Sequence, residues 1–324
     1  MSGIFVVLEE RDGRLSRASW EALAAALHLG SKSNEPVSAV VLGANTDATA
    51  AEAAGKSVAK VFRVAHSLLE HYTPDAYTTA LHQLIQRESP AQVVFPHTYQ
   101  VRDFAPKLAA RLGQVLISDV VAIGDGPVFT RQLMQGRLNG NYRHQGDGPC
   151  LVSVQAGAFR ADAVPSGTAE IVTFEPNIDP AAIRTRPGDA FRGSTQTVDL
   201  GSAPLIVAVG RGIKEAENLP LVQDLAAALG AELAASRPIC DNGWLPIERQ
   251  VGSSGQTVAP KLYLALGISG AIQHVVGMKG ARTTAAINKD QNAPIFEVAD
   301  YGVVGDLFEI VPALIEELEK SKSA

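Results

Sequence analysis

The sequence predicts an α/β protein built from two doubly wound, mostly parallel-sheet domains. Three observations lead to this fold class. The chain has 324 residues, enough for two domains at about 100–200 residues each. Its hydrophobic content of 46% and charged content of 19% suit folded domains with sizeable cores. Short apolar runs alternate with amphipathic stretches from Ile4 to Leu112, and the alternation restarts at Leu205, which indicates parallel strands covered by helices.

Four apolar runs in the N-terminal half have the length and composition of buried strands. Each is followed by a stretch with helical spacing. Ser16 or Ser19 and Asp47 are the expected N-caps of the first two helices, and Pro74 suits the first turn of the third. The expected strands are Ile4–Leu8, Val37–Leu42, Ala59–Val64 and Gln92–Pro96, and the expected helices are Ser16–Leu29, Asp47–Ala54, Pro74–Glu88 and Val101–Leu112.

The pattern changes after Leu112, where short apolar runs alternate with polar turns and no helix is expected. We interpret these runs as antiparallel strands added to the edge of the sheet: Leu116–Ile123, Val128–Gln135, Gly140–Arg143, Cys150–Gln155 and Ile171–Phe174. The segment Glu175–Leu200 contains three prolines, several charges and no clear period, so it is expected to be a linker. The predicted domains are therefore residues 1–190 and residues 200–324.

The C-terminal domain repeats the strand and helix alternation. Leu219–Leu229 is expected to be a helix that ends at Gly230, and Val304–Lys320 has an apolar stripe along one face. The expected strands are Leu205–Val209, Glu232–Ala235, Lys261–Leu266 and Thr283–Ile287, and a further helix is expected at Ser269–Val276.

Charge and cysteine content exclude several classes of function. The net charge of −6 argues against a protein that binds the nucleic-acid backbone, although one small anionic ligand remains compatible with it. Cys150 and Cys240 match no zinc spacing and are expected to be free thiols in a reducing compartment. No apolar run reaches the length of a membrane span, and the N-terminus has the pattern of a first strand. A cytoplasmic location is expected.

Glycine-rich and polar segments follow three strands of the C-terminal domain. Gly210-Arg211-Gly212 follows the strand Leu205–Val209, Gly267-Ile268-Ser269-Gly270 follows Lys261–Leu266, and Asn288 follows Thr283–Ile287. Open parallel sheets bind ligands beyond the carboxyl ends of their strands, where helix N-termini attract phosphate and glycine lets a ligand approach the backbone. A phosphate-bearing ligand is therefore expected at this edge.

Individually these residues leave alternatives open. GRGIKE lacks the third glycine of a dinucleotide fingerprint, and an ordinary strand-to-helix turn explains it equally well. Arg237 is either a surface ion-pair partner or a guanidinium that stacks on an aromatic ring in the cleft. Ser254 is either a turn hydroxyl or a hydrogen-bond donor to a ring nitrogen. His274, taken alone, is more often a packed or solvated histidine than a ligand contact.

The motifs taken together resemble the electron transfer flavoprotein alpha subunit. They are SRPICDNGWLP, RQVGSSG, LYLALGISGAIQHVVGMKG and INKDQNAPIFEVADYGVVGDLFEIVPALIEEL, and they follow the family's order over about 125 residues. The N-terminal half is similar through its alternating pattern and the segment LISDVVAI. The resemblance implies an N-terminal domain of the adenine-nucleotide-hydrolase-like type that contacts a beta subunit. It also implies a C-terminal domain that holds one FAD.

The resemblance assigns FAD contacts residue by residue. Arg211 and the turn from Ser269 to His274 would contact the phosphates and the ribityl chain. Ser236 and Arg237 would lie at the flavin, Ser254 near flavin N5 and His274 near the C2 carbonyl. Asn288, Asp306 and Leu307 would contact the adenosine side. The remaining implied contacts are Val251, Gly252 and Ser253 in the first turn, and Gly267, Gly270, Ala271, Ile272 and Gln273 in the second. No metal is expected.

Arg237 and His274 are expected to raise the flavin reduction potential, because a nearby cation or donor stabilises the negative charge of a reduced flavin. Two positions depart from the family pattern. Ser253 replaces a glutamine, and Gln256 replaces a basic residue, so the tuning of the potential is expected to differ.

The functional expectation is an electron carrier rather than a substrate-converting enzyme. It would pair with a beta subunit, accept electrons from flavin dehydrogenases such as those of fatty acid beta-oxidation, and pass them to a quinone oxidoreductase or similar acceptor. Two alternatives stay open. One is a subunit of an electron-bifurcating complex that oxidises NADH at a second FAD in the partner. The other is a nucleotide-binding module that senses rather than transfers.

Overall fold

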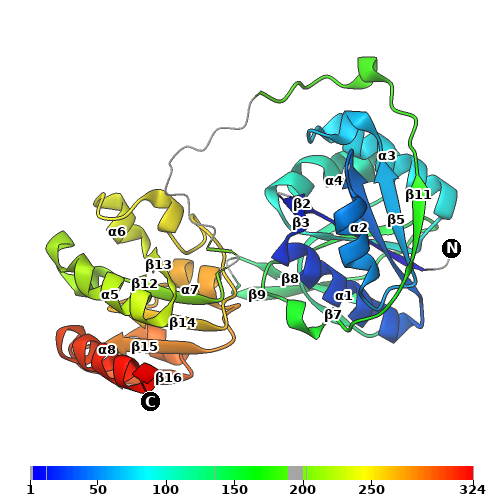
Figure 1. Ribbon diagram of the computed structural model, residues 1–324. Helices are drawn as coiled ribbons and strands as arrows, with labels where there is room; N and C mark the ends of the chain where they lie inside the picture. The colour runs from blue at the N-terminus through cyan, green and yellow to red at the C-terminus, as the bar shows by residue number, and fades with distance from the viewer. Residues whose placement is uncertain (1–2, 12, 135, 189–199, 202, 324) are drawn as a thin grey trace. The chain divides into compact units, whose positions relative to one another are not determined.

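The computed structural model describes residues 3–11, 13–134, 136–188, 200–201 and 203–323. The chain divides into two compact units, Met1–Ala190 and Phe191–Ala324, called unit 1 and unit 2 below. Each unit consists of one main sheet with helices on both faces (Figure 1). An α/β architecture of two mostly parallel sheets is thereby confirmed.

The described residues of unit 1 form a nine-stranded sheet in the order β11-β5-β4-β1-β6-β10-β7-β8-β9. Every neighbouring pair from β11 to β7 is parallel, and only the last two pairs are antiparallel. The strands are β1 (Ile4–Leu8), β4 (Val37–Gly43), β5 (Lys60–Ala65), β6 (Gln92–Pro96), β7 (Leu116–Gly124), β8 (Val128–Leu133), β9 (Leu138–Tyr142), β10 (Cys150–Val154) and β11 (Glu170–Phe174). A hairpin joins β2 (Glu10–Arg11) to β3 (Arg14–Leu15).

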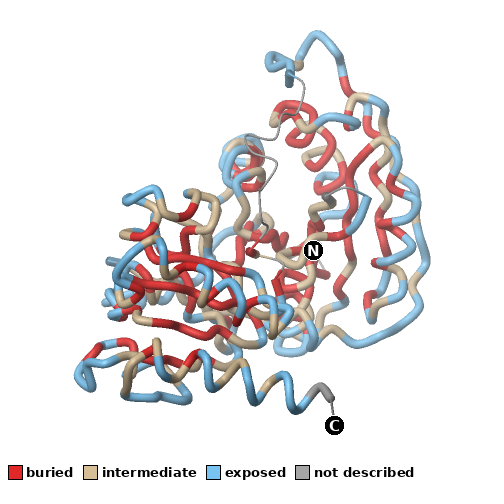
Figure 2. The backbone as a smooth tube through the Cα atoms, turned by 60° about the vertical axis from the view of Figure 1, so that its left-hand side comes forward, coloured by how far each residue is buried: buried red, intermediate tan, exposed pale blue. Residues whose placement is uncertain are grey.

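Four helices cover the two faces of this sheet. The helices α1 (Arg17–Ser33) and α2 (Asp47–Ala54) pack on one face, and α3 (Pro74–Glu88) and α4 (Tyr99–Leu112) pack on the other. Each face has its own apolar core, and β1 contributes alternate side chains to both. Figure 2 shows the buried residues gathered along the strands. This two-sided burial explains why the strands are continuous apolar runs.

Side-chain hydrogen bonds to the backbone mark where helices of unit 1 begin. Ser16 caps α1 by accepting a hydrogen bond from the Ser19 backbone, as one of the two expected candidates. Asp47 is not the N-cap of α2, because Thr46 occupies that position and Asp47 instead pairs with Arg63. The helix α1 runs four residues past the expected Leu29 and ends where Asn34 adopts the left-handed conformation.

The prediction of antiparallel additions at the sheet edge is wrong for three of the five segments. The strand β10 lies inside the sheet, parallel to both β6 and β7, so β7 is parallel to the main sheet as well. The strand β11 pairs in parallel with β5 at the opposite edge. Only β8 and β9 form an antiparallel extension beyond β7. The local sequence does not encode these pairings, because they join residues far apart along the chain. The expected strand end at Gln135 lies outside the described residues.

Unit 2 contains a five-stranded sheet among its described residues, in the order β13-β12-β14-β15-β16 with all pairs parallel. Its strands are β12 (Leu205–Val209), β13 (Glu232–Ala235), β14 (Leu262–Leu266), β15 (Thr284–Asn288) and β16 (Tyr301–Val304). Its helices are α5 (Leu219–Leu229), α6 (Arg237–Asp241), α7 (Ile272–Met278) and α8 (Leu307–Ser323). The helices α5 and α8 pack together on one face, and Met278 of α7 belongs to the core on the other.

Unit 2 differs from the expected elements at its C-terminal end. The expected helix start at Val304 is wrong, because Val304 belongs to β16 and α8 begins at Leu307. Asp306 lies between β16 and α8, and its carboxylate caps the helix by accepting a hydrogen bond from the Phe308 backbone. Likewise, α7 begins at Ile272 rather than Ser269, because Ser269 and Gly270 form the preceding loop.

The expected linker at Glu175–Leu200 contains one short 3-10 helix, Pro180–Ala182. Ile178 is buried against unit 1, and Asp75 binds both the backbone and the side chain of Arg184. The first part of the segment is therefore attached to unit 1. Residues 189–199 of the expected linker lie outside the described residues.

Candidate functional site

The candidate site lies at the carboxyl ends of the unit 2 strands. Counted within the unit, the strand order is 2-1-3-4-5, and the order reverses between β12 and β14. Ligands of open α/β sheets bind at such a reversal. Two backbone hydrogen bonds join the loops that leave these strands: Gly210 N to Leu266 O at 2.8 Å and Gly212 N to Gly267 O at 3.0 Å.

Two features of this reversal require glycine: the close approach of the two loops and the positive φ of Gly267. Gly267 has a φ of +60°, and a Cβ added to it would lie 2.6 Å from the Gly212 Cα. A Cβ on Gly212 would lie 2.5 Å from the Gly267 Cα. The two loops therefore touch backbone to backbone at these glycines, where no side chain lies between them. A ligand phosphate can approach such a surface closely.

The two glycine- and serine-rich segments of the sequence lie against each other. Ser253 N donates to Gln273 O at 2.7 Å, so the turn 251–256 is attached to the start of α7. A Cβ on Gly252, whose φ is +144°, would lie 2.8 Å from the same carbonyl oxygen, and one on Gly277 would lie 2.4 Å from Gly252 N. Ser253, Ser254 and Gln273 are all exposed. The two turns thus form one exposed surface of hydroxyl, amide and backbone groups.

His274 is the buried polar residue of this surface, at 6% exposure. Its Nε2 lies 2.8 Å from the Tyr263 hydroxyl, and Nδ1 makes no hydrogen bond of normal geometry within the described part of the chain. Burial lowers the pKa of His274 to about 4, and the adjacent Val251 backbone opposes this effect. The imidazole is therefore neutral at pH 7.

Gln250 and Tyr263 contact predicted site residues, Ser254 and His274, and were not predicted from the sequence. The buried Gln250 side chain lies with its Nε2 2.9 Å from the Ser254 hydroxyl, and its Oε1 has no partner among the described residues. Tyr263 is fully buried in β14 and holds His274. Both positions resemble ordinary core residues in the sequence. The one signal was a tyrosine in the middle of an otherwise aliphatic strand, LYLAL.

Ser236 and Arg237 lie at the end of β13, where α6 begins. Ser236 is buried and its backbone N–H donates to Val209 O at 3.0 Å, which fixes the loop beside β12. The Arg237 side chain is 68% exposed and pairs with Asp241 at 3.2 Å, one helical turn later. An exposed pair of this kind is weak, so the guanidinium is available to a ligand.

A second group of the expected residues lines a pocket at the ends of β14 and β15. The pocket has a volume of about 150 Å³ and is lined by Gly212, Lys214, Gly267, Ile287, Asn288, Lys289, Gly305 and Leu307. The Asn288 side chain, in the wall of this pocket, donates a hydrogen bond to Ile268 O at 2.9 Å. Lys289 lies 2.6 Å from Asp306 and, together with the Phe308 backbone, lowers the pKa of that carboxyl group.

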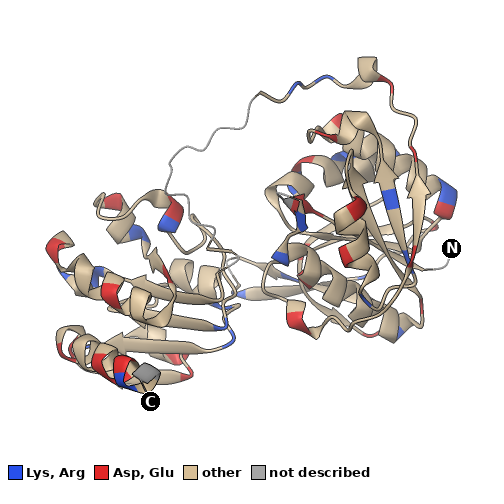
Figure 3. Cartoon of the chain, in the orientation of Figure 1, with Lys and Arg blue, Asp and Glu red and all other residues tan. Residues whose placement is uncertain are grey.

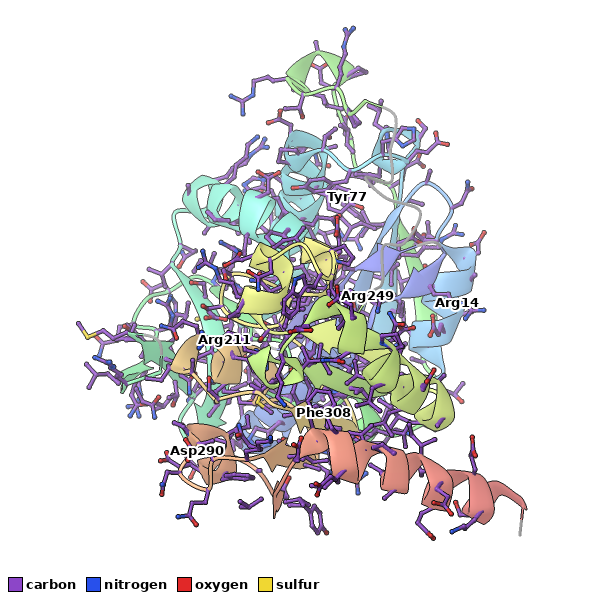
Figure 4. All side chains as sticks on the ribbon, turned by 90° about the vertical axis from the view of Figure 1, so that its left-hand side faces the viewer. Arg14, Tyr77, Arg211, Arg249, Asp290 and Phe308 are labelled. Atoms are coloured by element: carbon purple, nitrogen blue, oxygen red, sulfur yellow. The ribbon has the colours of Figure 1, made fainter. Side chains whose placement is uncertain are left out.

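The structure brings the predicted residues to one edge of unit 2. They come from the loops after β12, β13, β14 and β15, from the turn 251–256 and from the start of α8. Figure 4 labels Arg211, Asp290 and Phe308, which belong to three of these segments. Apart from Glu232, the unit 2 strands carry no charged residue, so the charges near the site come from loops and helices (Figure 3).

These features fit a dinucleotide with an uncharged aromatic ring system. Glycine contacts leave space for a pyrophosphate, and Arg211 is an exposed cation in the loop after β12. The exposed hydroxyls of Ser253 and Ser254 and the exposed amide of Gln273 can form hydrogen bonds with the polar edge of a ring. Among the described residues, no group of histidine, cysteine or acidic side chains could hold a metal ion. No described helix is long and apolar enough to cross a membrane.

Comparisons with known proteins agree with this geometry. Residues 4–179 match the family model of the electron transfer flavoprotein domain, and residues 199–279 match that of the electron transfer flavoprotein FAD-binding domain. The fold and site therefore define an FAD-binding flavoprotein of the electron transfer class.

The similarity to curated relatives covers almost the full chain. The chain is 39% identical to the electron transfer flavoprotein subunit alpha of Mycobacterium tuberculosis, strain H37Rv, over 99% of this chain and 100% of that protein. It is 37% identical to the same subunit of Bacillus subtilis, over 98% and 97%. It is 32% identical to the acryloyl-CoA reductase electron transfer subunit beta of Anaerotignum propionicum, over 99% and 96%. The chain belongs to the electron transfer flavoprotein alpha subunit family.

Proposed function

We propose that this chain is the FAD-holding subunit of a heterodimeric electron carrier. Unit 1 would contact the beta subunit, and unit 2 would bind FAD at the carboxyl edge of its sheet. The heterodimer would accept electrons from flavin dehydrogenases, such as acyl-CoA dehydrogenases, and deliver them to a quinone oxidoreductase or a similar acceptor. The observation that carries the proposal is the surface formed by the turns 251–256 and 269–274, which Ser253 N and Gln273 O join at 2.7 Å, with His274 buried at the start of α7.

Bound FAD would supply the capacity to take up and release electrons one or two at a time. The residues of this chain would set how readily that happens. Tyr263 lies with its hydroxyl 2.8 Å from His274 Nε2 and keeps the imidazole in place. Arg237 adds an exposed positive charge that favours negative charge on a nearby ring. Both groups would raise the reduction potential.

The exposure of the site favours a carrier over an enzyme with its own substrate. Ser253, Ser254, Gln273 and Arg237 are all exposed in this chain. The described residues of unit 2 include no element that closes over the two turns. Electron transfer between proteins requires an accessible flavin, whereas most catalytic sites exclude water. The proposal therefore assigns this chain a carrier role and no bond-making residue.

The similarity to the electron transfer subunit of acryloyl-CoA reductase supports a second candidate function. In that case the heterodimer would belong to a reductase complex and oxidise NADH at a second FAD in its partner. The two candidates differ in flavin content and in response to NADH. The carrier would contain one FAD per heterodimer and stay oxidised when NADH is added. The alternative predicts two FAD per heterodimer and bleaching of the flavin absorbance by NADH.

A further inference from the structure

The backbone at Lys214 has a conformation that side chains rarely adopt. Its φ is +69° and its ψ is −59°, and Glu215 N donates to Ile213 O at 2.9 Å. This is a γ-turn of the rare strained type with a positive central φ. Asn34 and Ser89, two other non-glycine residues with positive φ, sit in the ordinary left-handed region as helix C-caps. Lys214 lies outside that region.

The surrounding structure imposes this turn from both sides. Ile213 is fully buried in the core of unit 2, and its carbonyl oxygen also accepts a hydrogen bond from the Asn218 side chain at 2.9 Å. Gly212 is tied to Gly267 across the strand reversal. A glycine at position 214 would adopt the turn without strain, yet this position carries a lysine. Strained residues held in this way concentrate at functional sites.

The turn directs the lysine side chain toward the pocket beside α8. The Lys214 Nζ lies 4.7 Å from the centre of the Phe308 ring, in the first turn of α8, and Lys214 lines the pocket of about 150 Å³. On another wall, Lys289 is paired with Asp306, and Lys214 also acts electrostatically on that carboxylate. Two ammonium groups therefore line the pocket, and Asp306 pairs with that of Lys289, which leaves one positive charge in excess.

We propose that Lys214 is a positioning residue for the nucleotide half of FAD. Its ammonium group fixes the Phe308 ring as a wall of the pocket before the ligand arrives, and its charge favours the phosphate-bearing part of the cofactor. The inference rests on the proposed FAD site, and it adds a residue that the family motifs did not single out.

The experiment compares FAD binding and thermal stability in the full chain copurified with its partner subunit. Apoprotein is prepared, FAD affinity is measured by fluorescence titration, and Tm is measured without FAD. Lys214→Met keeps the length and the strain but removes the charge, and its Kd for FAD is expected to rise about tenfold. The loss should shrink at high salt because the interaction is electrostatic. Lys214→Arg keeps a cation over the ring and should retain most of the affinity.

Lys214→Gly separates strain from function. Glycine adopts the turn freely, so the apoprotein Tm should rise by about 2–4 °C while FAD affinity falls at least as far as in Lys214→Met. Lys261→Met, at the opposite end of the β14 strand, is the matched control and should leave Kd unchanged. Kd values within twofold of the parent in both Lys214→Met and Lys214→Gly would overturn the inference while leaving the FAD site intact. A parent protein that binds no FAD would instead overturn the proposed function.

Discussion

The two units have similar sheets but different carboxyl edges. In unit 2 the loops after β12 and β14 meet backbone to backbone through Gly212 and Gly267. In unit 1 the strand order also reverses, between β1 and β6, but side chains of the unit itself occupy that edge. The Thr98 hydroxyl donates to the Glu9 carboxylate there, and His97 Nδ1 lies 2.9 Å from the Ser153 hydroxyl.

The comparison shows that a strand reversal alone does not make a ligand site. The same topology creates a crevice in both units, and the residues that follow the strands decide whether it is filled. In unit 1, the Glu9 carboxylate also adds a negative charge beside Thr98. In unit 2, glycine contacts and an excess of positive charge leave the edge suited to FAD. The predictions below test this difference, from the largest expected effect to the smallest.

The largest effect is expected from Gly267→Ala in unit 2. The added Cβ would collide with the Gly212 backbone at a φ of +60°, so we expect a loss of about 3–5 kcal/mol in unfolding free energy and loss of bound FAD. Gly230→Ala is the matched control, because Gly230 has a φ of +62° with nothing within 4 Å of the added Cβ. It should cost about 1 kcal/mol and keep FAD. Equal losses in the two variants would show that crowding at the reversal is unimportant.

A smaller effect concerns the pH dependence of the apoprotein. Because burial lowers the pKa of His274 from 6.5 to about 4, the unfolded chain binds this proton more readily than the folded chain. Above pH 6.5 the histidine is neutral in both states and does not lower the unfolding free energy. As the pH falls from 6.5 toward about 4, the unfolded chain takes up the proton first and the unfolding free energy decreases. The total loss is about 3 kcal/mol.

The measurement is denaturant unfolding of the apoprotein and of His274→Gln between pH 7 and pH 4. The variant lacks the titrating group, so its stability should fall less steeply across this window. Parallel curves for the two proteins would contradict the burial of a neutral histidine at this position.

Arg237→Ala is expected to change the flavin potential while the fold stays intact. The guanidinium is mostly exposed, so its loss should change stability by less than about 0.5 kcal/mol. A positive charge near the ring favours the reduced flavin, and the reduction potential should therefore fall in the variant. A redox titration with reference dyes provides the measurement, with Arg249→Ala as the control. An unchanged potential would remove Arg237 from the flavin site.

The smallest effect on FAD is expected from Thr98→Val in unit 1. This change removes the hydrogen bond to Glu9 and the N-cap of α4, and should cost about 1–2 kcal/mol of stability. FAD content should not change, because the edge of unit 1 is not the ligand site. A variant that folds but loses FAD would contradict the assignment of the ligand site to unit 2 alone.

Elements bounded by local signals could be predicted from the sequence. The strands β1, β6, β12 and β13 begin and end where expected, because each is an apolar run with polar or turn residues beside it. The helix α3 also matches, since Pro74 and Glu88 mark its ends. The position of β10 inside the sheet could not be predicted, because its pairing with β6 joins residues far apart along the chain. The exposed strand β16 was missed for a different reason. Its sequence YGVV has no alternation of apolar and polar residues that would mark it as a strand.

The candidate site shows the same division. The glycine segments after β12 and β14 and the polar residue after β15 were identified by their place at strand ends. The roles given to Ser236, Arg237 and Ser254 came from the family resemblance and stay predictions. Gln250 and Tyr263 were missed because their importance depends on contacts with Ser254 and His274 that only the folded structure shows. Lys214 was missed because a strained turn leaves no mark in the sequence.

Hydrogen–deuterium exchange of the purified heterodimer, with and without FAD, tests the central claim most directly. Backbone amides protected by a ligand exchange more slowly. We expect FAD to protect residues 210–214, 251–256 and 267–274 in unit 2, and to leave residues 97–100 in unit 1 unchanged. Protection at residues 97–100, with none at the three unit 2 segments, would contradict the account.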